Sequence, residues 1–204
     1  MVIIMNSSKV YTLKGAIEDI DVDITQYNNQ YIFKKETNSR VELEICRILM
    51  AHPYKNIVHI FEVGTNYVIM EQVNIDLAGV CNDDLLVTMT EVKTYLQNLG
   101  IIYIDWKPDN IGISTQGKLK LFDFDVSGLL DVHTQNWIIN PKPYYAYNAA
   151  NSNGFTTPIE IDNYCFNEFL RKVMKRKKTC SNCLLLFGIL VMYYGGLWYW
   201  CWCW

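Results

Sequence analysis

Hydrophobic and polar positions alternate through residues 10–70 in the manner of short β-strands. The alternation is carried by four apolar runs with polar turns between them, "KVYTLKG", "QYIFKKE", "NIVHIFEVG" and "NYVIMEQV". A period of two turns one face of such a run toward a core and the other toward solvent. The pattern therefore predicts an antiparallel sheet in this part of the chain.

Three other segments have helical spacing. In "NSRVELEICRILMAH" apolar residues recur every three or four positions behind Ser39, a residue type favoured at helix N-termini. "LLVTMTEVKTYLQNLG" repeats this spacing and stops at Gly100, a common signal for a helix C-terminus. "PIEIDNYCFNEFLRKVM" is predicted to form a third helix that begins just after Pro158. Residues 126–160, rich in Asn, Pro, Tyr and Gly, are predicted to be mostly loop.

The last 22 residues, 183–204, carry no charge. At about 1.5 Å per residue a helix of this length spans the ~30 Å hydrocarbon core of a bilayer. Trp and Tyr crowd its far end and basic residues precede it, as at membrane interfaces. We predict a single-pass C-terminal transmembrane helix. The alternatives are a buried core helix and a zinc site made of Cys180, Cys183, Cys201 and Cys203.

Charge is distributed unevenly along the chain. Residues 1–170 carry 12 basic and 21 acidic side chains, whereas residues 171–204 carry six basic and no acidic ones. The acidic body disfavours nucleic acid as a partner, because basic surfaces bind the phosphate backbone. The seven cysteines lack the spacing of a secreted disulfide framework. We therefore expect the body to face the cytosol while the anchor lies in a membrane.

The stretch "YIDWKPDNIGISTQGKLKLFDFD", residues 103–125, concentrates the candidate chemistry. Phosphoryl transfer requires that metal-bound phosphates and an acceptor hydroxyl be held in line. Asp105 could orient that hydroxyl or accept its proton, and Lys107 could offset charge on the transferring group. Asn110 and Asp123 could bind the same magnesium ion. Any one of these acids alone would be an ordinary solvated loop residue, but the joint spacing is specific.

These motifs resemble the eukaryotic-type protein kinase family. "YIDWKPDNIG" is similar to the family's H-R-D-L-K-P-x-N catalytic loop, and "KLKLFDFD" to the strand that leads into its D-F-G. The resemblance implies an α+β, protein-kinase-like two-lobed fold, here with a truncated C-lobe, and ATP with Mg²⁺ or Mn²⁺ as cofactors. Residues 1–73 would form the N-lobe and residues 74–170 the reduced C-lobe. A basic juxtamembrane segment, 171–182, would precede the anchor at 183–204.

The resemblance extends upstream of the catalytic loop. "YIFK" is similar to the family's V-A-I-K strand and implies that Lys34 holds the α- and β-phosphates of ATP, with Lys35 as a solvated neighbour. "EICRILMAHPYKNIVHIFEVG" resembles the family's αC helix and following strand, which implies Glu44 as the partner of Lys34. Glu42 is the competing acid for this role.

Two further segments resemble parts of the family with lower specificity. "YVIMEQV" is similar to the hinge, with Met70 as gatekeeper, Glu71 offering a backbone carbonyl to adenine and Val73 adding backbone contacts. The plain alternative is a buried strand. "TTPIEIDNYCFNEFL" resembles the start of the αF helix, where Asp162 would anchor the catalytic loop.

The chain also departs from the family pattern. "LKGAIEDIDVD" has Gly15 alone where the glycine-rich loop has three glycines, which predicts weaker phosphate binding. Tyr103 and Ile104 replace His and Arg of H-R-D, which disfavours switching by a phosphorylated activation loop. Asp125 replaces the glycine of D-F-G. The losses fall on phosphate cradling and regulation, and the residues of the chemical step remain.

The sequence therefore favours a membrane-tethered minimal kinase that phosphorylates protein Ser/Thr hydroxyls, because Lys107 resembles the residue of serine/threonine kinases. A pseudokinase-type scaffold with weak or no transfer is the alternative. A small-molecule kinase, as in the aminoglycoside and choline kinase group, is disfavoured because those proteins lack that lysine. The motifs also resemble kinase-like proteins of large DNA viruses.

Deleting residues 179–204 is expected to move the protein from the membrane fraction of cells to the soluble fraction, because it removes the charge-free segment. Fractionation with immunoblotting measures this. Aggregation of the shortened chain would favour the core-helix alternative, and retention in membranes would contradict the anchor.

Overall fold

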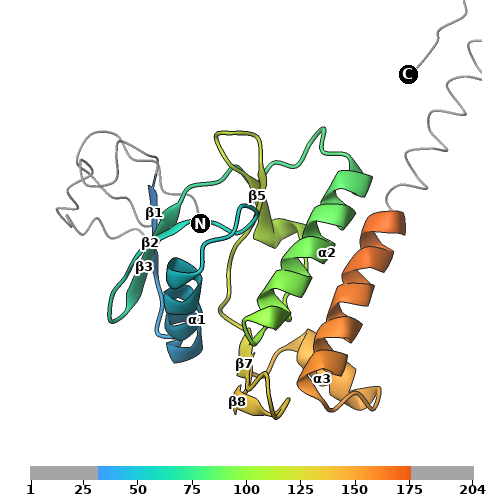
Figure 1. The fold of residues 1–204 in the computed structure, drawn as a ribbon. Helices are drawn as coiled ribbons and strands as arrows, with labels where there is room; N and C mark the ends of the chain where they lie inside the picture. The colour runs from blue at the N-terminus through green and yellow to red at the C-terminus, as the bar shows by residue number, and fades with distance from the viewer. Residues whose placement is uncertain (1–31, 176–204) are drawn as a thin grey trace, which may run out of the picture.

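The structure, a computed structural model, describes residues 32–175, so the Gly15 loop and the charge-free C-terminal segment lie outside the described residues. The first part is an antiparallel sheet of β1 (Ile32–Glu36), β2 (Ile60–Val63) and β3 (Tyr67–Glu71) in the order β1-β3-β2. Helix α1 (Arg40–Ala51) contacts β2 and β3 (Figure 1). The antiparallel sheet and the interposed helix are confirmed within the described residues.

Helix α1 forms where its apolar spacing and its N-cap both favour it. The Ser39 hydroxyl accepts a hydrogen bond from the Glu42 backbone N–H at 3.4 Å, which satisfies one of the free donors at the helix start. Val41, Ile45 and Leu49 share the buried face, as i, i+4 and i+8 positions do. The helix therefore presents one fixed face to the sheet.

The second part contains most of the helices. Helix α2 (Asn82–Asn98) leads into β4 (Ile101–Ile102), the 3-10 turn η2 (Pro108–Asn110), β5 (Ile111–Ile113) and β6 (Leu119–Leu121). Strands β7 (Gly128–Leu130) and β8 (Trp137–Ile139), helix α3 (Tyr145–Ser152) and a helix over residues 158–175 follow. The sheets are β4-β7-β8 and β5-β6. Helix α2 and the helix at 158–175 run side by side (Figure 1).

The prediction that residues 126–160 are mostly loop is wrong in part, because β7, β8 and α3 lie within them. Strand β7 pairs with β4 on one side and β8 on the other. A Cβ at Gly128 would lie 2.5 Å from the Trp137 ring, so the close approach of these strands requires glycine. The helix predicted after Pro158 is confirmed, and residues 158–175 are helical.

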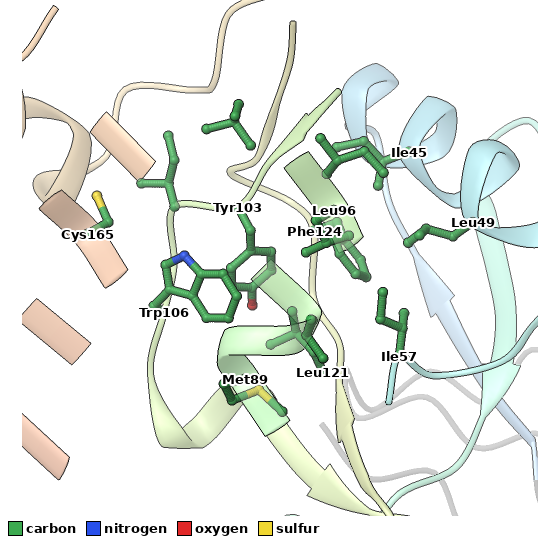
Figure 2. Packing of buried hydrophobic residues seen from close by; sticks show 14 of the residues in the cluster. Ile45, Leu49, Ile57, Met89, Leu96, Tyr103, Trp106, Leu121, Phe124 and Cys165 are labelled. Carbon is green, nitrogen blue, oxygen red and sulfur yellow. The ribbon is translucent and has the colours of Figure 1, made fainter. Parts of the chain in front are cut away.

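An aromatic cluster fills the centre of the second part. Tyr103 lies between Trp106 and Phe124 in edge-to-face contacts, with ring centroids 4.8 and 5.4 Å away (Figure 2). Trp106 also meets Phe166 of the helix at 158–175 at 4.7 Å. Such pairs contribute about 0.5–1.5 kcal/mol beyond the burial of their area. The loop that carries Asp105 therefore rests on the core.

The buried carboxylate of Asp162 holds the loop that carries Asp105 in place. It accepts hydrogen bonds from Trp106 Nε1 at 2.9 Å and from Gln97 Nε2 of α2 at 2.7 Å, and Lys93 Nζ lies 3.6 Å away. The predicted contact between Asp162 and the catalytic loop is present, through the indole N–H. Burial raises the pKa of Asp162 to about 6, against the opposing effect of Lys93.

Among helices of residues 32–175, none has the length and apolarity that crossing a membrane requires. The predicted transmembrane helix at 183–204 lies outside this range. It therefore stays a prediction from the sequence.

The raised pKa of Asp162 predicts a pH dependence of stability. The folded state holds this proton more tightly than the unfolded chain does, so the stabilisation is full below about pH 4 and is lost as pH rises through about 6. Relative to Asp162→Asn, which cannot titrate, the wild-type free energy of unfolding should fall by up to about 3 kcal/mol between pH 4 and 7. Urea unfolding across this range measures the difference, and parallel curves would contradict it.

Candidate active site

Three of the predicted site residues meet at one carboxylate oxygen. Lys107 Nζ lies 2.6 Å from Asp105 Oδ2, and Asn110 Nδ2 donates to the same oxygen at 2.9 Å. Asn110 Nδ2 also donates to the Asp105 backbone carbonyl at 3.0 Å. The other oxygen, Asp105 Oδ1, is buried and makes no hydrogen bond of ordinary geometry with the described residues. One carboxylate oxygen is thus occupied and the other is uncommitted.

The turn η2 produces this convergence. Pro108 begins the turn, where its fixed φ suits the first position, and the Asn110 backbone N–H bonds the Lys107 carbonyl at 3.1 Å. The tight turn brings the Asn110 side chain back over Asp105. The spacing of these residues therefore has a local structural cause.

Tyr103 connects the turn to the strand exit that carries Asp123. Its hydroxyl donates to the Phe122 carbonyl at 2.9 Å and accepts from Asn110 Nδ2 at 3.0 Å. The ring is fully buried, and burial raises the pKa of Tyr103 well above its usual value, so the phenol stays protonated. The sequence indicated Tyr103 only as a lost histidine. Its hydroxyl in fact links Asn110 to the backbone of Phe122, the residue before Asp123.

Asp123 adopts a backbone conformation that residues other than glycine rarely take. Its φ is +65°, in the left-handed region. Such strain persists where surrounding contacts hold the residue, and it concentrates at functional sites. Lys35 Nζ supplies one of those contacts, at 2.6 Å from Asp123 Oδ1.

The predicted pairing of Lys34 with Glu44 is wrong. Lys35 Nζ lies 2.5 Å from Glu42 Oε1, and Glu42 is only 1% exposed. Lys34 instead lies over the Tyr67 ring at 4.6 Å, and Glu44 forms an exposed pair with Arg47 at 3.2 Å.

The reason for this correction is the direction of neighbouring side chains. Adjacent residues of a strand point to opposite faces, so only one of two consecutive lysines can face Asp123. Residues two apart on a helix are about 200° apart around its axis, so only one of the two acids can face the sheet. The match to the family motif had selected Lys34 and Glu44, whereas Lys35 and Glu42 are the residues that face the site.

The residues predicted for the hinge lie at the end of β3. The Glu71 carboxylate accepts from Lys120 Nζ at 2.8 Å and from the His59 backbone N–H at 3.1 Å. Val73 packs closely against Gly112, where a Cβ would come within 2.5 Å of Val73 Cγ2. The side chains of both residues thus hold β3 against the β5-β6 sheet, and their contacts with adenine stay predictions.

Asp125, in the place of the D-F-G glycine, has two partners. Lys142 Nζ lies 2.5 Å from Asp125 Oδ1, and the Ser39 hydroxyl approaches the Asp125 carbonyl at 3.4 Å.

Burial first, and the adjacent Asp105 carboxylate second, raise the pKa of Tyr144 above its usual value. Residues 142–144 therefore reach the site from a segment in which the sequence indicated no chemistry.

The donor set fits a magnesium ion that also binds phosphate. Within residues 32–175 no three His, Cys, Asp or Glu side chains are grouped to hold a metal by themselves. Mg²⁺ commonly takes one or two protein ligands and completes its shell with water and substrate phosphates. Asn110 uses its Nδ2 on three protein acceptors, which turns its carbonyl oxygen away from them, and Lys35 contacts only Oδ1 of Asp123. Asn110 Oδ1 and Asp123 Oδ2 are the atoms that would hold the ion.

A separate hollow of about 380 Å³ lies between the start of α2 and the β5-β6 hairpin. Its lining includes Cys81, Asp84 and Lys118 and none of the predicted site residues. The candidate site is therefore defined by the converging side chains around Asp105 and not by this hollow.

Replacing Lys35 by Met should lower the free energy of unfolding by about 3 kcal/mol, because Glu42 would remain buried without its cation. Lys34→Met is the matched control and should cost less than about 1 kcal/mol, since it removes only the contact with the Tyr67 ring. Denaturant unfolding of both variants measures the difference. Equal losses would show that the Lys35 pair does not have this structural role, and Lys35→Met combined with Glu42→Gln should recover part of the loss.

Comparison with known proteins gives matches to parts of the chain. No family model matches it. Human cGMP-dependent protein kinase 2 is 39% identical over 57 residues, covering 28% of this chain and 8% of that protein. Human serine/threonine-protein kinase greatwall is 35% identical over 83 residues, covering 34% of this chain and 9% of that protein. The chain thus spans less than a tenth of the length of these two curated relatives.

A solved structure, the yeast RNA Pol II CTD kinase CTDK-1 complex, aligns with a TM-score of 0.42 and 22% identity, over 52% of this chain and 42% of that one. The sequence matches to the two human kinases are the stronger finding. Over the matched residues, the chain is therefore similar in sequence to serine/threonine protein kinases.

Proposed function

We propose that this chain is a minimal protein kinase that transfers the γ-phosphoryl group of ATP to Ser/Thr hydroxyls. One observation carries the proposal. Lys107 and Asn110 both bind Asp105 Oδ2, while Asp105 Oδ1 keeps no ordinary hydrogen bond with the described residues. A carboxylate held in this way can orient an acceptor hydroxyl through its second oxygen. The similarity to serine/threonine kinases supports the same reaction class.

The residues around Asp105 divide the work of the transfer. Asp105 orients the acceptor hydroxyl and takes its proton as the new oxygen–phosphorus bond forms. Burial opposes charge on Lys107, but its hydrogen bond and charge interaction with Asp105 prevail and raise the pKa of Lys107. Lys107 therefore remains a cation beside the transferring group, where it offsets negative charge.

Lys35, and not Lys34, is the residue that we propose for the phosphates of ATP. It lies between Glu42 and Asp123, whereas Lys34 faces Tyr67. Burial lowers and the two carboxylates raise the pKa of Lys35, and the net effect is a raised pKa. Mg²⁺ held by Asn110 and Asp123 would offset charge on the phosphate oxygens. Glu71 and Val73 stay the proposed adenine contacts through their backbone.

The substrate class and location rest on the sequence. Lys107 stands where serine/threonine kinases carry a lysine, which favours Ser and Thr hydroxyls of proteins as acceptors. The uncharged residues 183–204 support tethering to a membrane, with the body on the cytosolic side.

A scaffold that binds a partner or nucleotide without transferring phosphate is the second candidate. Two departures favour it, namely Gly15 as the lone glycine of the predicted phosphate loop and Asp125 in place of the D-F-G glycine. The membrane anchor would then hold a binding partner at the membrane, and no phosphate would be transferred.

Radiolabel transfer from γ-labelled ATP with Mg²⁺ or Mn²⁺ to a generic basic protein tests the proposal. Asp105→Asn should lower the rate at least 100-fold, because it removes the proton acceptor, and Asp123→Asn should do the same through the metal. Asp109→Asn is the matched control in the same loop, since Asp109 is exposed, and it should retain the rate. No transfer by folded wild-type protein, or equal transfer by Asp105→Asn, would favour the scaffold.

A further inference from the structure

The hollow between the start of α2 and the β5-β6 hairpin is separate from the candidate active site and has a polar lining of its own. Its volume of about 380 Å³ lies in the range of small-molecule sites. Asn56, Asp84, Thr88 and Lys118 contribute to its wall. Polar groups in such a place need hydrogen-bond partners, which come from water or from a ligand.

Asn56 presents its amide oxygen to this hollow. The residue is only 9% exposed, and its Nδ2 donates to the Leu119 carbonyl at 2.8 Å. Its Oδ1 accepts no hydrogen bond from the described residues, yet it is not one of their fully buried polar atoms that lack a partner. Oδ1 is therefore reached by solvent, and the hollow that Asn56 lines provides the access. A mostly buried amide, fixed by its nitrogen, thus offers a free acceptor.

Two opposite charges line the hollow from different walls without pairing. Asp84 belongs to the first turn of α2, and Lys118 lies just before β6 in the hairpin. Neither side chain forms an ion pair or a hydrogen bond with the described residues. Thr88 lies one helical turn after Asp84, on the same face of α2, and its hydroxyl is equally free of the described residues.

The remaining wall is largely aliphatic and is held in place by the backbone. Val80, Ile113 and Leu119 line it. Ile113 pairs with Leu119 across the hairpin, and its backbone exchanges hydrogen bonds of 2.7 and 2.8 Å with Asn74. The hollow is therefore preformed on this side, and its aliphatic wall can take an apolar group out of water.

We propose that this hollow binds a small zwitterion, an α-amino acid with an aliphatic side chain. The Asp84 carboxylate and Asn56 Oδ1 accept hydrogen bonds from the ammonium group of the ligand. Lys118 pairs with its carboxylate, and the aliphatic wall contacts its side chain. The site uses no ATP and none of the residues proposed for phosphoryl transfer, so it goes beyond the proposed function and does not depend on it.

The two unpaired charges select against ligands with a single charge. An anion that meets Lys118 is repelled by Asp84, and a cation that meets Asp84 is repelled by Lys118. A ligand that carries both charges satisfies both walls. This complementarity, together with the aliphatic wall, identifies the ligand class.

Thermal unfolding of the full chain, purified in detergent, tests binding. L-Leucine at about 10 mM should raise the Tm by about 2 °C or more, because a ligand that binds only the folded state stabilises it. L-Leucinamide lacks the carboxylate and N-acetyl-L-leucine lacks the ammonium group, and both should leave the Tm unchanged. Lys118→Met and Asp84→Asn should each abolish the shift by L-leucine. Asp83→Asn is the matched control, because Asp83 is an exposed acid of the same turn that does not line the hollow, and it should keep the shift.

Cys81 gives a readout at the hollow itself, because its side chain is exposed and it contributes to the lining. Alkylation by iodoacetamide, followed by peptide mass spectrometry, measures how accessible its thiol is. Saturating L-leucine should slow the modification of Cys81 about fivefold or more, in proportion to occupancy. The Lys118→Met variant should show no such protection.

The outcomes decide the proposal without any measurement of phosphoryl transfer. The absence of a Tm shift with L-leucine, L-isoleucine and L-valine, in protein shown to be folded by circular dichroism, would overturn it. An equal shift by N-acetyl-L-leucine would indicate an anion site and an equal shift by L-leucinamide a cation site, and either result would exclude recognition of a zwitterion. A shift without protection of Cys81 would place the ligand outside the hollow and overturn the assignment.

Discussion

The buried hydroxyl of Tyr103 is the contact on which the candidate site depends. It donates to the Phe122 carbonyl and accepts from Asn110, so one oxygen joins the catalytic turn to the strand exit that precedes Asp123. A buried hydroxyl without partners would cost free energy, so this position is stable only when both segments are in place. Tyr103 therefore links the two segments through a single hydroxyl.

A second set of contacts joins the N-terminal sheet and α1 to this centre. Lys35 of β1 bridges Glu42 of α1 and Asp123, so one cation joins the sheet and α1 to the site. Asp125 and Lys142 add a third connection, to the segment that carries Tyr144. Ile104, in the place of the family's arginine, is buried and apolar, which suits a chain that positions this segment with an ion pair of its own. Two of the residues that depart from the family pattern, Tyr103 and Asp125, thus make side-chain contacts that join separate segments.

The sequence by itself determined the elements whose cause is local. Helices α1 and α2 follow from apolar residues at helical spacing, and α1 begins at Ser39 as its cap predicted. Asp105, Lys107 and Asn110 converge because they lie within six residues on a loop and a proline-initiated turn, which a short motif fully encodes. The antiparallel sheet followed from alternation, which requires one face of each strand to be buried.

Only the tertiary structure decided which of two neighbouring residues enters the site. The motif match favoured Lys34 and Glu44 over Lys35 and Glu42. The sequence does not show which face of β1 or α1 meets Asp123, which lies 88 residues along the chain from Lys35. Strands β7 and β8 were missed because they are three residues each and exist only by pairing, β7 with β4 and β8 with β7. Local propensity acts over a few residues, whereas the direction of a side chain relative to a distant partner is fixed only when the layers pack.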